Sequence, residues 1–370
     1  MRKVYLEDIC DIKIGRTPPR KQPQWFSESH GIKWASIKDM GNTGKYISQT
    51  SEFLTADAIK KFNIPIIPAG TLLMSFKLTV GRLGFTEYDM CSNEAIAQLP
   101  IKDPDIVDKN YLYYYLKNFN FGSLSSTSSI ATAVNSKTVK NISINLPPLD
   151  QQKKITNILG SLDEKIELNR RMNETLEQLG QALFRHYFVD KTKQNNCNIQ
   201  TIPLGKKFHP KRGRGLQARD MICGDTPVIS GGLKPAGFHN EANTTAPVIT
   251  ISASGANAGF VSVWGEPVWS ADSSYIDSTT IKYVYTYYLF LKNKQKEIYD
   301  MQTGSGQPHI YPKHIELLEI ADLSDCEFND FEQRVRPLFD MIHKNKKQIY
   351  SLSNIRDSLL PKLISGEIEV

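Results

Sequence analysis

The strongest chemical signal in this chain is a run of basic residues near its centre. Between residues 191 and 219 there is no aspartate or glutamate. The basic residues of the run are Lys191, Lys193, Lys206, Lys207, Lys211, Arg212, Arg214 and Arg219. Lysine and arginine contact phosphate oxygens through charge and donated hydrogen bonds. The run therefore predicts contact with a polyanion such as duplex DNA, and the alternative is a solvated basic loop.

Further side chains suited to nucleic-acid contacts lie outside this run. Phosphate contacts need cations, whereas base contacts need loop side chains with several donors or acceptors. The candidates in the N-terminal part are Arg16, Arg20, Lys21, Lys33, Lys38, Lys77, Arg82, Asn135 and Lys137. In the C-terminal part, Gln307 and His309 beside a Gly-Ser-Gly turn are candidate base contacts, and Lys234 and Asn257 are weaker ones. For any single lysine the alternative is a solvated surface charge.

No catalytic pattern in the sequence has the required spacing. Asp150 and the triplet Asp163-Glu164-Lys165 resemble the acidic set of a nuclease, but that chemistry needs carboxylates converging on a metal. Here the triplet lies on a predicted helix between apolar positions. No glycine-rich loop with a phosphate-binding spacing follows a predicted strand, and the histidines show no metal-ligand pairing. We expect a non-enzymatic chain without a catalytic residue, cofactor or metal of its own.

Composition is compatible with a cytoplasmic DNA-binding protein. The chain has 370 residues, enough for two or three domains, and a net charge of +6, which permits a polyanionic partner. Its sequence contains no apolar stretch of the length of a signal peptide or a membrane span. The cysteines are scattered singly, as expected of reduced thiols. We therefore expect a cytoplasmic location and no membrane partner.

The segments that must position these residues alternate between β-rich and helical patterns. We expect an α+β protein with four segments: a β-rich domain over residues 1–148, a long helix within 149–190, a second β-rich domain over 191–323, and a second long helix within 324–370. The first helix is predicted from about Gln151 to Phe188. The second is predicted from about Asn329, with a break or bend at Pro337 and near Pro361.

The two long helices repeat one apolar pattern. Adding 176 to 162 and 166 takes Leu162 to Leu338 and Ile166 to Ile342. A repeat of this length implies a domain and a helix made twice, related by a pseudo-twofold axis. We expect antiparallel, coiled-coil-like helices whose seam comprises Leu162, Ile166, Asn169, Leu176, Leu179, Leu183, Leu338, Ile342, Asn345, Leu352, Ile355 and Leu359. The alternative is that each helix packs on its own domain.

The β-rich segments share an apolar frame but differ in their polar loop residues. Residues 72–85 parallel residues 248–260, for example, with different side chains between the strands. Different polar groups on one scaffold contact different base edges. The pattern predicts two unlike half-sites, and so an asymmetric, bipartite DNA target.

Residues 146–188, LPPLDQQKKITNILGSLDEKIELNRRMNETLEQLGQALFRHYF, resemble the central conserved region of type I restriction-modification specificity (S) subunits. The C-terminal SLLPKLISGEIEV and the GRTPPR near Gly15 resemble other parts of that family. The resemblance implies a non-catalytic specificity subunit with two target recognition domains on a helical spacer that acts as a ruler. It also implies two adenine-methyltransferase (M) subunits and motor-nuclease (R) subunits as partners, with AdoMet, ATP and Mg²⁺ bound only by those partners.

The second repeat departs from the family pattern because residues 320–335, IADLSDCEFNDFEQRV, lack the Leu-Pro-Pro-Leu of the first. Two alternatives remain beside the specificity subunit. The first is a specificity module for a system with methylase and nuclease in one partner chain. The second is a self-contained enzyme, which the missing motifs disfavour. The bases of the target, the spacer length and the oligomeric state of the free chain do not follow from the sequence.

Overall fold

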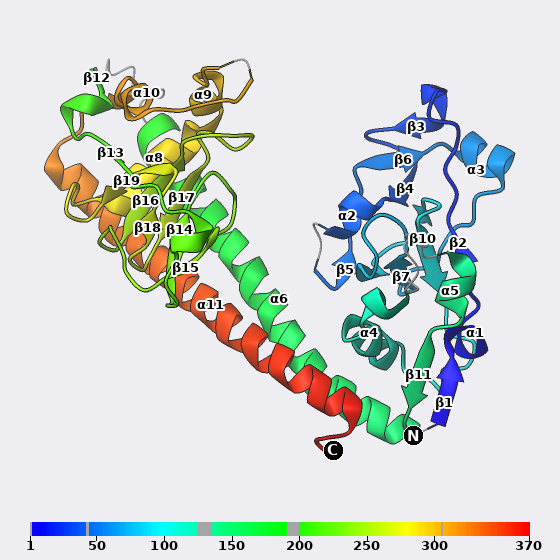
Figure 1. Ribbon diagram of the computed structural model, residues 1–370. Helices are drawn as coiled ribbons and strands as arrows, with labels where there is room; N and C mark the ends of the chain where they lie inside the picture. Colours follow the sequence, from blue (N-terminus) through cyan, green and yellow to red (C-terminus); the bar gives the residue numbers. More distant parts are fainter. Residues whose placement is uncertain (1, 42–43, 125–134, 191–199, 305) are drawn as a thin grey trace. The chain divides into compact units, whose positions relative to one another are not determined.

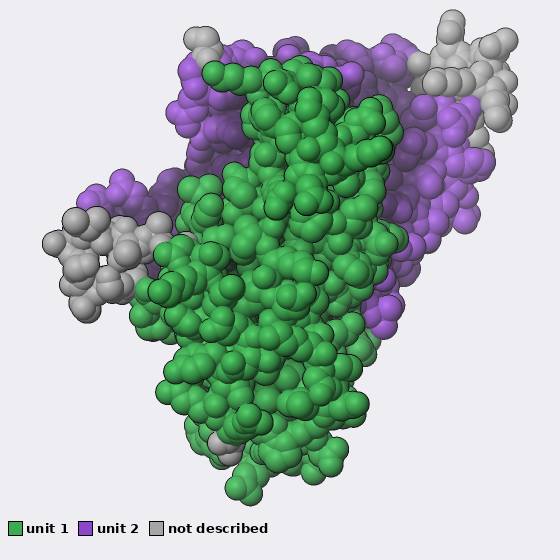
Figure 2. All heavy atoms as spheres, turned by 90° about the vertical axis from the view of Figure 1, so that its right-hand side faces the viewer, with its two compact units in different colours: residues 1–167, 350–370 green, residues 168–349 purple. Residues whose placement is uncertain are grey.

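The computed structural model describes the chain except residues 1, 42–43, 125–134, 191–199 and 305. It forms two compact units: unit 1 comprises residues 1–167 and 350–370, and unit 2 comprises residues 168–349 (Figure 2). Each unit combines one β-rich segment with a part of both long helices. This division follows contacts rather than the chain order of the predicted domains, whose boundaries at 148, 190 and 323 stay predictions.

The described residues of unit 1 form three small sheets and five short α-helices. The five-stranded sheet has the order β2 (Lys13–Ile14), β10 (Ile96–Leu99), β7 (Leu72–Ser75), β8 (Leu83–Thr86) and β5 (Tyr46–Ile47). The four-stranded sheet has the order β3 (Phe26–Ser27), β6 (Glu52–Leu54), β4 (Ile32–Ala35) and β9 (Cys91–Ser92). β1 (Arg2–Tyr5) pairs with β11 (Ser143–Leu146). The short helices are α1 (Leu6–Ile9), α2 (Ile37–Gly41), α3 (Ala56–Phe62), α4 (Lys109–Lys117) and α5 (Ser136–Lys140).

In unit 2 the described residues likewise form three small sheets, with three short α-helices. The four-stranded sheet has the order β13 (Lys211–Arg212), β19 (Ser273–Asp277), β16 (Val248–Ser252) and β17 (Val261–Trp264). The three-stranded sheet has the order β15 (Gly237–His239), β14 (Thr226–Ile229) and β18 (Trp269–Ser270). β12 (Thr201–Pro203) pairs with β20 (Glu319–Ala321). The short helices are α8 (Val284–Asn293), α9 (Gln295–Asp300) and α10 (Pro312–Glu316).

The units repeat one strand order. The series β2-β10-β7-β8 of unit 1 corresponds to β13-β19-β16-β17 of unit 2, and β6-β4-β9 corresponds to β15-β14-β18. The last two strands of each second series pair in parallel, an unusual feature that both units keep. β3, β5, α2 and α3 are extra elements of unit 1, and α9 is an extra element of unit 2. The sequence repeat is thus a repeat of topology.

The two long helices are α6 (Leu149–Arg185) and α11 (Asp325–Ser365), drawn green and orange-red in Figure 1. The first was predicted within three residues at each end. The predicted break in the second is wrong, because α11 is assigned as one helix through Pro337 and Pro361. A helical proline leaves the carbonyl four residues earlier without its donor. Both prolines, Gln333 and Asp357 are exposed, so water can satisfy the freed carbonyls. None of the described helices is long and apolar enough to cross a membrane.

In each unit, the two helices pack against each other and against the β-rich part of that unit. In unit 1, Ile155 and Leu159 of α6 share a buried core with Leu360 and Leu363 of α11 and with the tyrosines of α4. In unit 2, Phe184 of α6 packs with Phe331 of α11 and with α8. Packing of the helices on each other and packing of each helix on a β-rich domain, the two alternatives drawn from the sequence, therefore occur together. The expected α+β fold, with two β-rich parts and two long helices packed together, is confirmed.

Polar residues connect the helices across their interface. In unit 2 the Nδ2 of Asn169 donates to Gln348 Oε1 at 2.8 Å, and the Nδ2 of Asn345 donates to Asn173 Oδ1 at 2.9 Å. Residue numbers rise on one helix as they fall on the other, so the helices are antiparallel. Both asparagines are buried, as expected of seam positions. A buried amide that must find its partner disfavours other registers.

The predicted seam is wrong at two positions. Leu179 and Ile355 are 45% and 47% exposed, whereas the other ten seam residues are buried or half-buried. At both places the next residue takes the inward position. The Cα of Gly180 faces Leu289, because a Cβ there would lie 3.4 Å from that side chain, and Arg356 is inward and ion-paired. Apolar periodicity missed these positions because glycine and arginine carry no apolar signal.

The ion pair at Arg356 supports a first prediction. Its Nη1 lies 2.7 Å from Asp163 Oδ1, and the hydroxyl of Tyr114 donates to Asp163 Oδ2 at 2.7 Å. Burial alone would raise the pKa of Asp163, but the hydrogen bonds from Arg356 and Tyr114 hold it below the ordinary aspartate value. We expect Asp163→Ala to lower the free energy of unfolding by about 3 kcal/mol, measured by chemical denaturation, because a buried charge loses its partner.

Asp357 provides the control for this prediction. It also pairs with Arg356, at 2.7 Å, but its side chain is largely exposed. Asp357→Ala should therefore change stability by less than about 1 kcal/mol. The Asp163 contribution is present above the unfolded-state aspartate pKa and is lost as pH falls through the lowered folded-state pKa. The two variants having equal effects would contradict the assignment.

Candidate nucleic-acid interface

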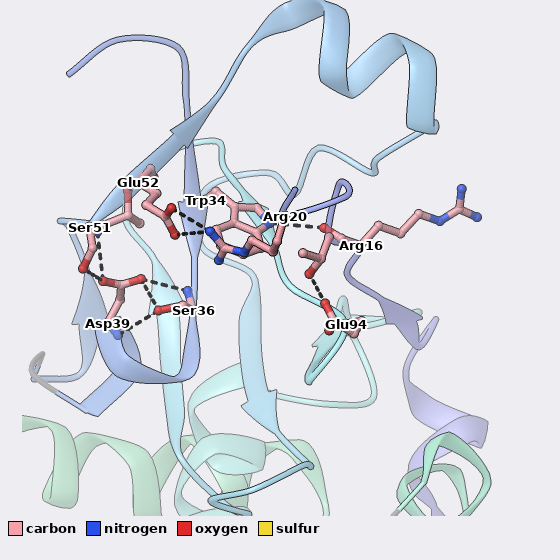
Figure 3. Close-up of polar contacts among 10 residues, drawn as sticks. Arg16, Arg20, Trp34, Ser36, Asp39, Ser51, Glu52 and Glu94 are labelled. Carbon is pink, nitrogen blue, oxygen red and sulfur yellow. Dashed lines mark hydrogen bonds and ion pairs between the residues drawn. The ribbon is translucent and has the colours of Figure 1, made fainter. Parts of the chain in front are cut away.

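Arg20 is held within unit 1 by aromatic and acidic partners (Figure 3). Its guanidinium carbon lies 4.5 Å from the ring centroid of Phe26 and 4.6 Å from that of Trp34. Its Nη1 donates to both carboxylate oxygens of Glu52, at 2.7 and 2.9 Å. Trp34 Nε1 in turn donates to the Arg16 carbonyl at 3.2 Å. Arg20 thus fastens residues 16–20 to the four-stranded sheet, and its charge is already paired.

Asp39 fixes the turn beside this sheet (Figure 3). Its Oδ2 accepts hydrogen bonds from the backbone and hydroxyl of Ser36 at 2.8 and 2.7 Å, and its Oδ1 accepts from the backbone and hydroxyl of Ser51 at 2.9 and 2.6 Å. Burial would raise the pKa of Asp39, but these bonds hold it below the ordinary value. The carboxylate is therefore a structural anchor rather than an acid or base poised for catalysis. This role does not follow from the sequence, because Ser51 lies twelve residues from Asp39.

Several other N-terminal candidates also hold neighbouring loops. The acceptors are the Phe62 carbonyl for Arg16 (3.0 Å), the Ser48 carbonyl for Lys33 and the Ile37 carbonyl for Arg82 (2.6 Å). Asn135 is the N-cap of α5, where its Oδ1 accepts from the backbone N–H groups of residues 137 and 138, both at 3.0 Å. Such roles explain these side chains without a ligand. Whether they also contact DNA stays a prediction.

The basic run of unit 2 is largely paired with acidic residues. The pairs are Lys207 with Asp322 (2.9 Å), Lys211 with Asp277 (3.8 Å), Arg212 with Asp272 (2.9 Å) and Arg219 with Asp220 (3.8 Å). Lys191 and Lys193 lie outside the described residues. The run therefore carries less unpaired charge than its sequence suggests. Aspartates from β18–β20 and nearby turns, most of them distant in sequence, form ion pairs with it.

Besides the weaker candidate Lys234, six candidates are exposed cations whose charged groups form neither an ion pair nor a hydrogen bond among the described residues. They are Lys21, Lys38, Lys77 and Lys137 in unit 1, and Lys206 and Arg214 in unit 2. Unpaired exposed cations are the groups best placed to bind phosphate, since no internal partner has to be displaced. They are the structure's strongest phosphate-contact candidates.

The candidate base contacts of unit 2 lie on adjoining loops. The backbone of His309 pairs with Thr303 and bridges to Ser254, and the Pro308 carbonyl accepts from the Gly255 N–H at 3.0 Å. The loop before α10 is thereby attached to the loop between β16 and β17, which also carries Asn257. The Gln307 side chain is exposed, while the His309 ring stacks on Tyr311 with centroids 6.0 Å apart. The loops that carry Gln307, His309 and Asn257 are therefore neighbours.

The acidic triplet that resembled a nuclease set does not form a metal site. Asp163 is bound by Arg356 and Tyr114, and its neighbour Glu164 is exposed on α6. Among the described residues, no cluster of histidine, cysteine, aspartate and glutamate could hold a metal ion.

Helix α6 carries exposed apolar side chains within unit 2. Leu168, Met172 and Leu179 are all exposed and follow one another by four and seven residues. At 100° per residue these spacings place the three on one narrow stripe of the helix. Isolated exposed leucines are ordinary, whereas a helical stripe of them is typical of a surface that another protein covers.

Comparison with known proteins connects these features to a family. Residues 1–178 match the type I restriction modification DNA specificity domain. A type I restriction enzyme specificity subunit of Methanocaldococcus jannaschii, MjaIX, is 26% identical over 99% of this chain and 93% of its own. The HindI specificity subunit of Haemophilus influenzae is 26% identical over 62% of this chain and 70% of its own.

The fold has a counterpart among solved structures. The crystal structure of a type I restriction-modification S subunit from Mycoplasma genitalium superposes with a TM-score of 0.62 over 98% of this chain and 95% of that chain, at 20% identity. Three observations agree with one another: the two β-rich parts with a pair of long helices, the match to the family's DNA specificity domain, and a relative aligned along almost the whole chain. The chain is thus similar along almost its whole length to a specificity subunit of a type I restriction enzyme, and its first 178 residues match the DNA specificity domain of that family.

Proposed function

We propose that this chain is the specificity subunit of a type I restriction-modification system. It recognises a bipartite, asymmetric duplex, with one half-site for each unit's β-rich domain and with α6 and α11 setting the distance between the half-sites. The supporting observation is the repeated strand order, β2-β10-β7-β8 and β13-β19-β16-β17, which carries different loops. Residues 76–81 of unit 1 read FKLTVG, and the corresponding residues 253–259 of unit 2 read ASGANAG. The same scaffold with different loops suits two half-sites that are contacted in the same way but differ in sequence.

We further propose that the helices recruit two methyltransferase subunits, which act with motor-nuclease subunits. The stripe of Leu168, Met172 and Leu179 supports a protein contact on α6. Delivery of a methyltransferase would make the target visible as methylated adenines. Methylation sequencing of genomic DNA from cells with and without this chain should give one asymmetric two-part motif that depends on the chain. A single continuous motif, or none, would refute the proposal.

A second prediction concerns the proposed phosphate contacts of unit 2. We expect the double variant Lys206→Ala, Arg214→Ala, assembled with its methyltransferase, to bind all duplexes more weakly because both unpaired cations are lost. The slope of log K against log salt should become shallower by about 1.8, since each phosphate contact contributes about 0.9. Fluorescence anisotropy with a random-sequence duplex and with the methylated motif, at several salt concentrations, measures both effects.

Lys153 and Lys154 supply a charge-matched control. Both are exposed on α6 and make no ion pair among the described residues. The double variant Lys153→Ala, Lys154→Ala lowers the net charge equally and should leave the salt slope unchanged. Equal slopes for the two double variants would mean that overall charge, rather than a local interface, governs binding.

A further inference from the structure

The loop that joins β7 to β8 presents an unsupported leucine. Leu78 is 96% exposed, whereas the next most exposed large apolar residue among those described, Leu317, is 66% exposed. Its φ is +60°, in the left-handed region, where the other described residues are seven glycines and Asn63. A residue with a Cβ pays about 1–2 kcal/mol for this conformation. Leu78 therefore costs backbone energy and gains no packing within the chain.

The loop beneath Leu78 is firmly held. The Phe76 N–H donates to the Ala95 carbonyl and the Gly81 N–H donates to the Ser75 carbonyl, both at 2.9 Å. Phe76 is buried, and a Cβ on Gly81 would clash with the Phe121 ring at 2.5 Å. The Leu78 side chain thus projects from a fixed base. Backbone strain that is kept at the tip of a rigid loop is typical of functional positions.

Unit 2 shows that the fold does not require a leucine here. Its β16–β17 loop has the same frame, with the Ala253 N–H donating to the Asp272 carbonyl and the Gly259 N–H donating to the Ser252 carbonyl. The residue three after Ser252 is Gly255, with a φ of +81°, just as Leu78 is the residue three after Ser75. The frame needs a left-handed residue, and glycine provides it without strain. The leucine of unit 1 is therefore an addition to the scaffold.

The surroundings of Leu78 are basic. Lys77 precedes it and is exposed. Arg82, at the other end of the loop, donates to the Ile37 carbonyl and so joins the loop to α2, which carries the exposed Lys38. An apolar tip between unpaired cations matches the side chains that DNA-bending proteins insert between base pairs, with lysines on the flanking phosphates. A docking surface for another protein would instead need further apolar residues around the tip.

We propose that Leu78 is an apolar wedge that inserts between two base pairs of the half-site recognised by unit 1, with Lys77 on a neighbouring phosphate. This inference rests on the proposed function. Because Gly255 has no side chain to insert, the wedge acts in one half-site only. The sequence at the inserted step then contributes to specificity through its ease of unstacking, without a hydrogen bond to a base.

Binding to a pre-opened duplex tests the wedge. The full chain with its methyltransferase is assayed on a duplex of the methylated motif and on copies in which one base of the first half-site, at each position in turn, is replaced by an abasic site. We expect Leu78→Ala and Leu78→Gly to bind the intact duplex at least tenfold more weakly. One abasic position should restore most of that loss, because its unstacking no longer has to be driven. Leu317→Ala, the same substitution at another exposed leucine, should bind like the wild type.

Three results would overturn the proposal. The variants could bind the intact duplex as tightly as the wild type. Replacing thymine by uracil in the first half-site could weaken the wild type to the level of the variants, which would place Leu78 against a thymine methyl group. The variants could fail to assemble with the methyltransferase, which sedimentation detects and which would make Leu78 a protein contact. A wild-type complex without any motif preference would instead remove the proposed function itself.

Discussion

Replacing residues 1–148 by the corresponding segment of another specificity subunit is expected to change one half of the methylated motif and leave the other half unchanged. The reason is that the loops of unit 1 belong to one β-rich part with its own sheets and core. Methylation sequencing of cells that express the chimera with the methyltransferase measures the result. The effect is all-or-none for each half of the motif, which makes it the largest expected from any change to this chain.

The exchanged segment must keep its contacts with the two long helices. Ile155 and Leu159 of α6, with Leu360 of α11, belong to the same core as the helix α4 of the exchanged segment. Tyr114 donates to Asp163 across the junction. A donor segment should therefore keep a tyrosine and apolar residues at the corresponding positions of its α4. The matched control exchanges residues 201–323 and should change only the other half. If either exchange altered both halves, separate recognition by the two units would be wrong.

The sequence predicted the architecture because the architecture depends on long, repeated patterns. The helix over 149–185 and the 176-residue repeat follow from apolar positions that recur many times. The start of α11 at Asp325 was missed, although Ser324 and Glu327 form a capping box in which Ser324 N–H donates to Glu327 Oε2 at 2.9 Å. That signal was present as Ser-x-x-Glu. It was outweighed by the loss of apolar periodicity before Asn329.

Individual site residues could not be predicted because their partners are distant in sequence. Arg20 meets Glu52, and Arg212 meets Asp272, through sheet contacts that no local pattern encodes. A count of charges along the chain therefore cannot separate paired cations from unpaired ones. Leu78 could not be recognised as a site residue for a different reason. In the sequence a leucine resembles a core residue, and only the structure gives its exposure and backbone conformation.

Lengthening both long helices by seven residues is expected to lengthen the spacer of the motif by about three base pairs while both halves stay the same. Seven residues add about 10 Å of helix, and about 3.4 Å separates successive base pairs. The insertions belong between Glu167 and Leu168 in α6 and between Ile349 and Tyr350 in α11, where the units divide. The Asp163–Arg356 ion pair and the Asn169–Gln348 hydrogen bond then stay intact on either side.

The insertion length provides the control, because seven residues bring the apolar seam back almost into phase, whereas five turn it by about 140°. The seven-residue variant should give a methylated motif with a longer spacer, and the five-residue variant should give a destabilised chain with little methylation. An insertion into α6 alone should also fail, since the Asp163–Arg356 pair on one side of it and the Asn169–Gln348 pair on the other could no longer both stay in register. An unchanged spacer in the stable seven-residue variant would show that the helices do not set the distance. The partners would then set it, and the repeated seam would serve only to hold two recognition domains in one chain.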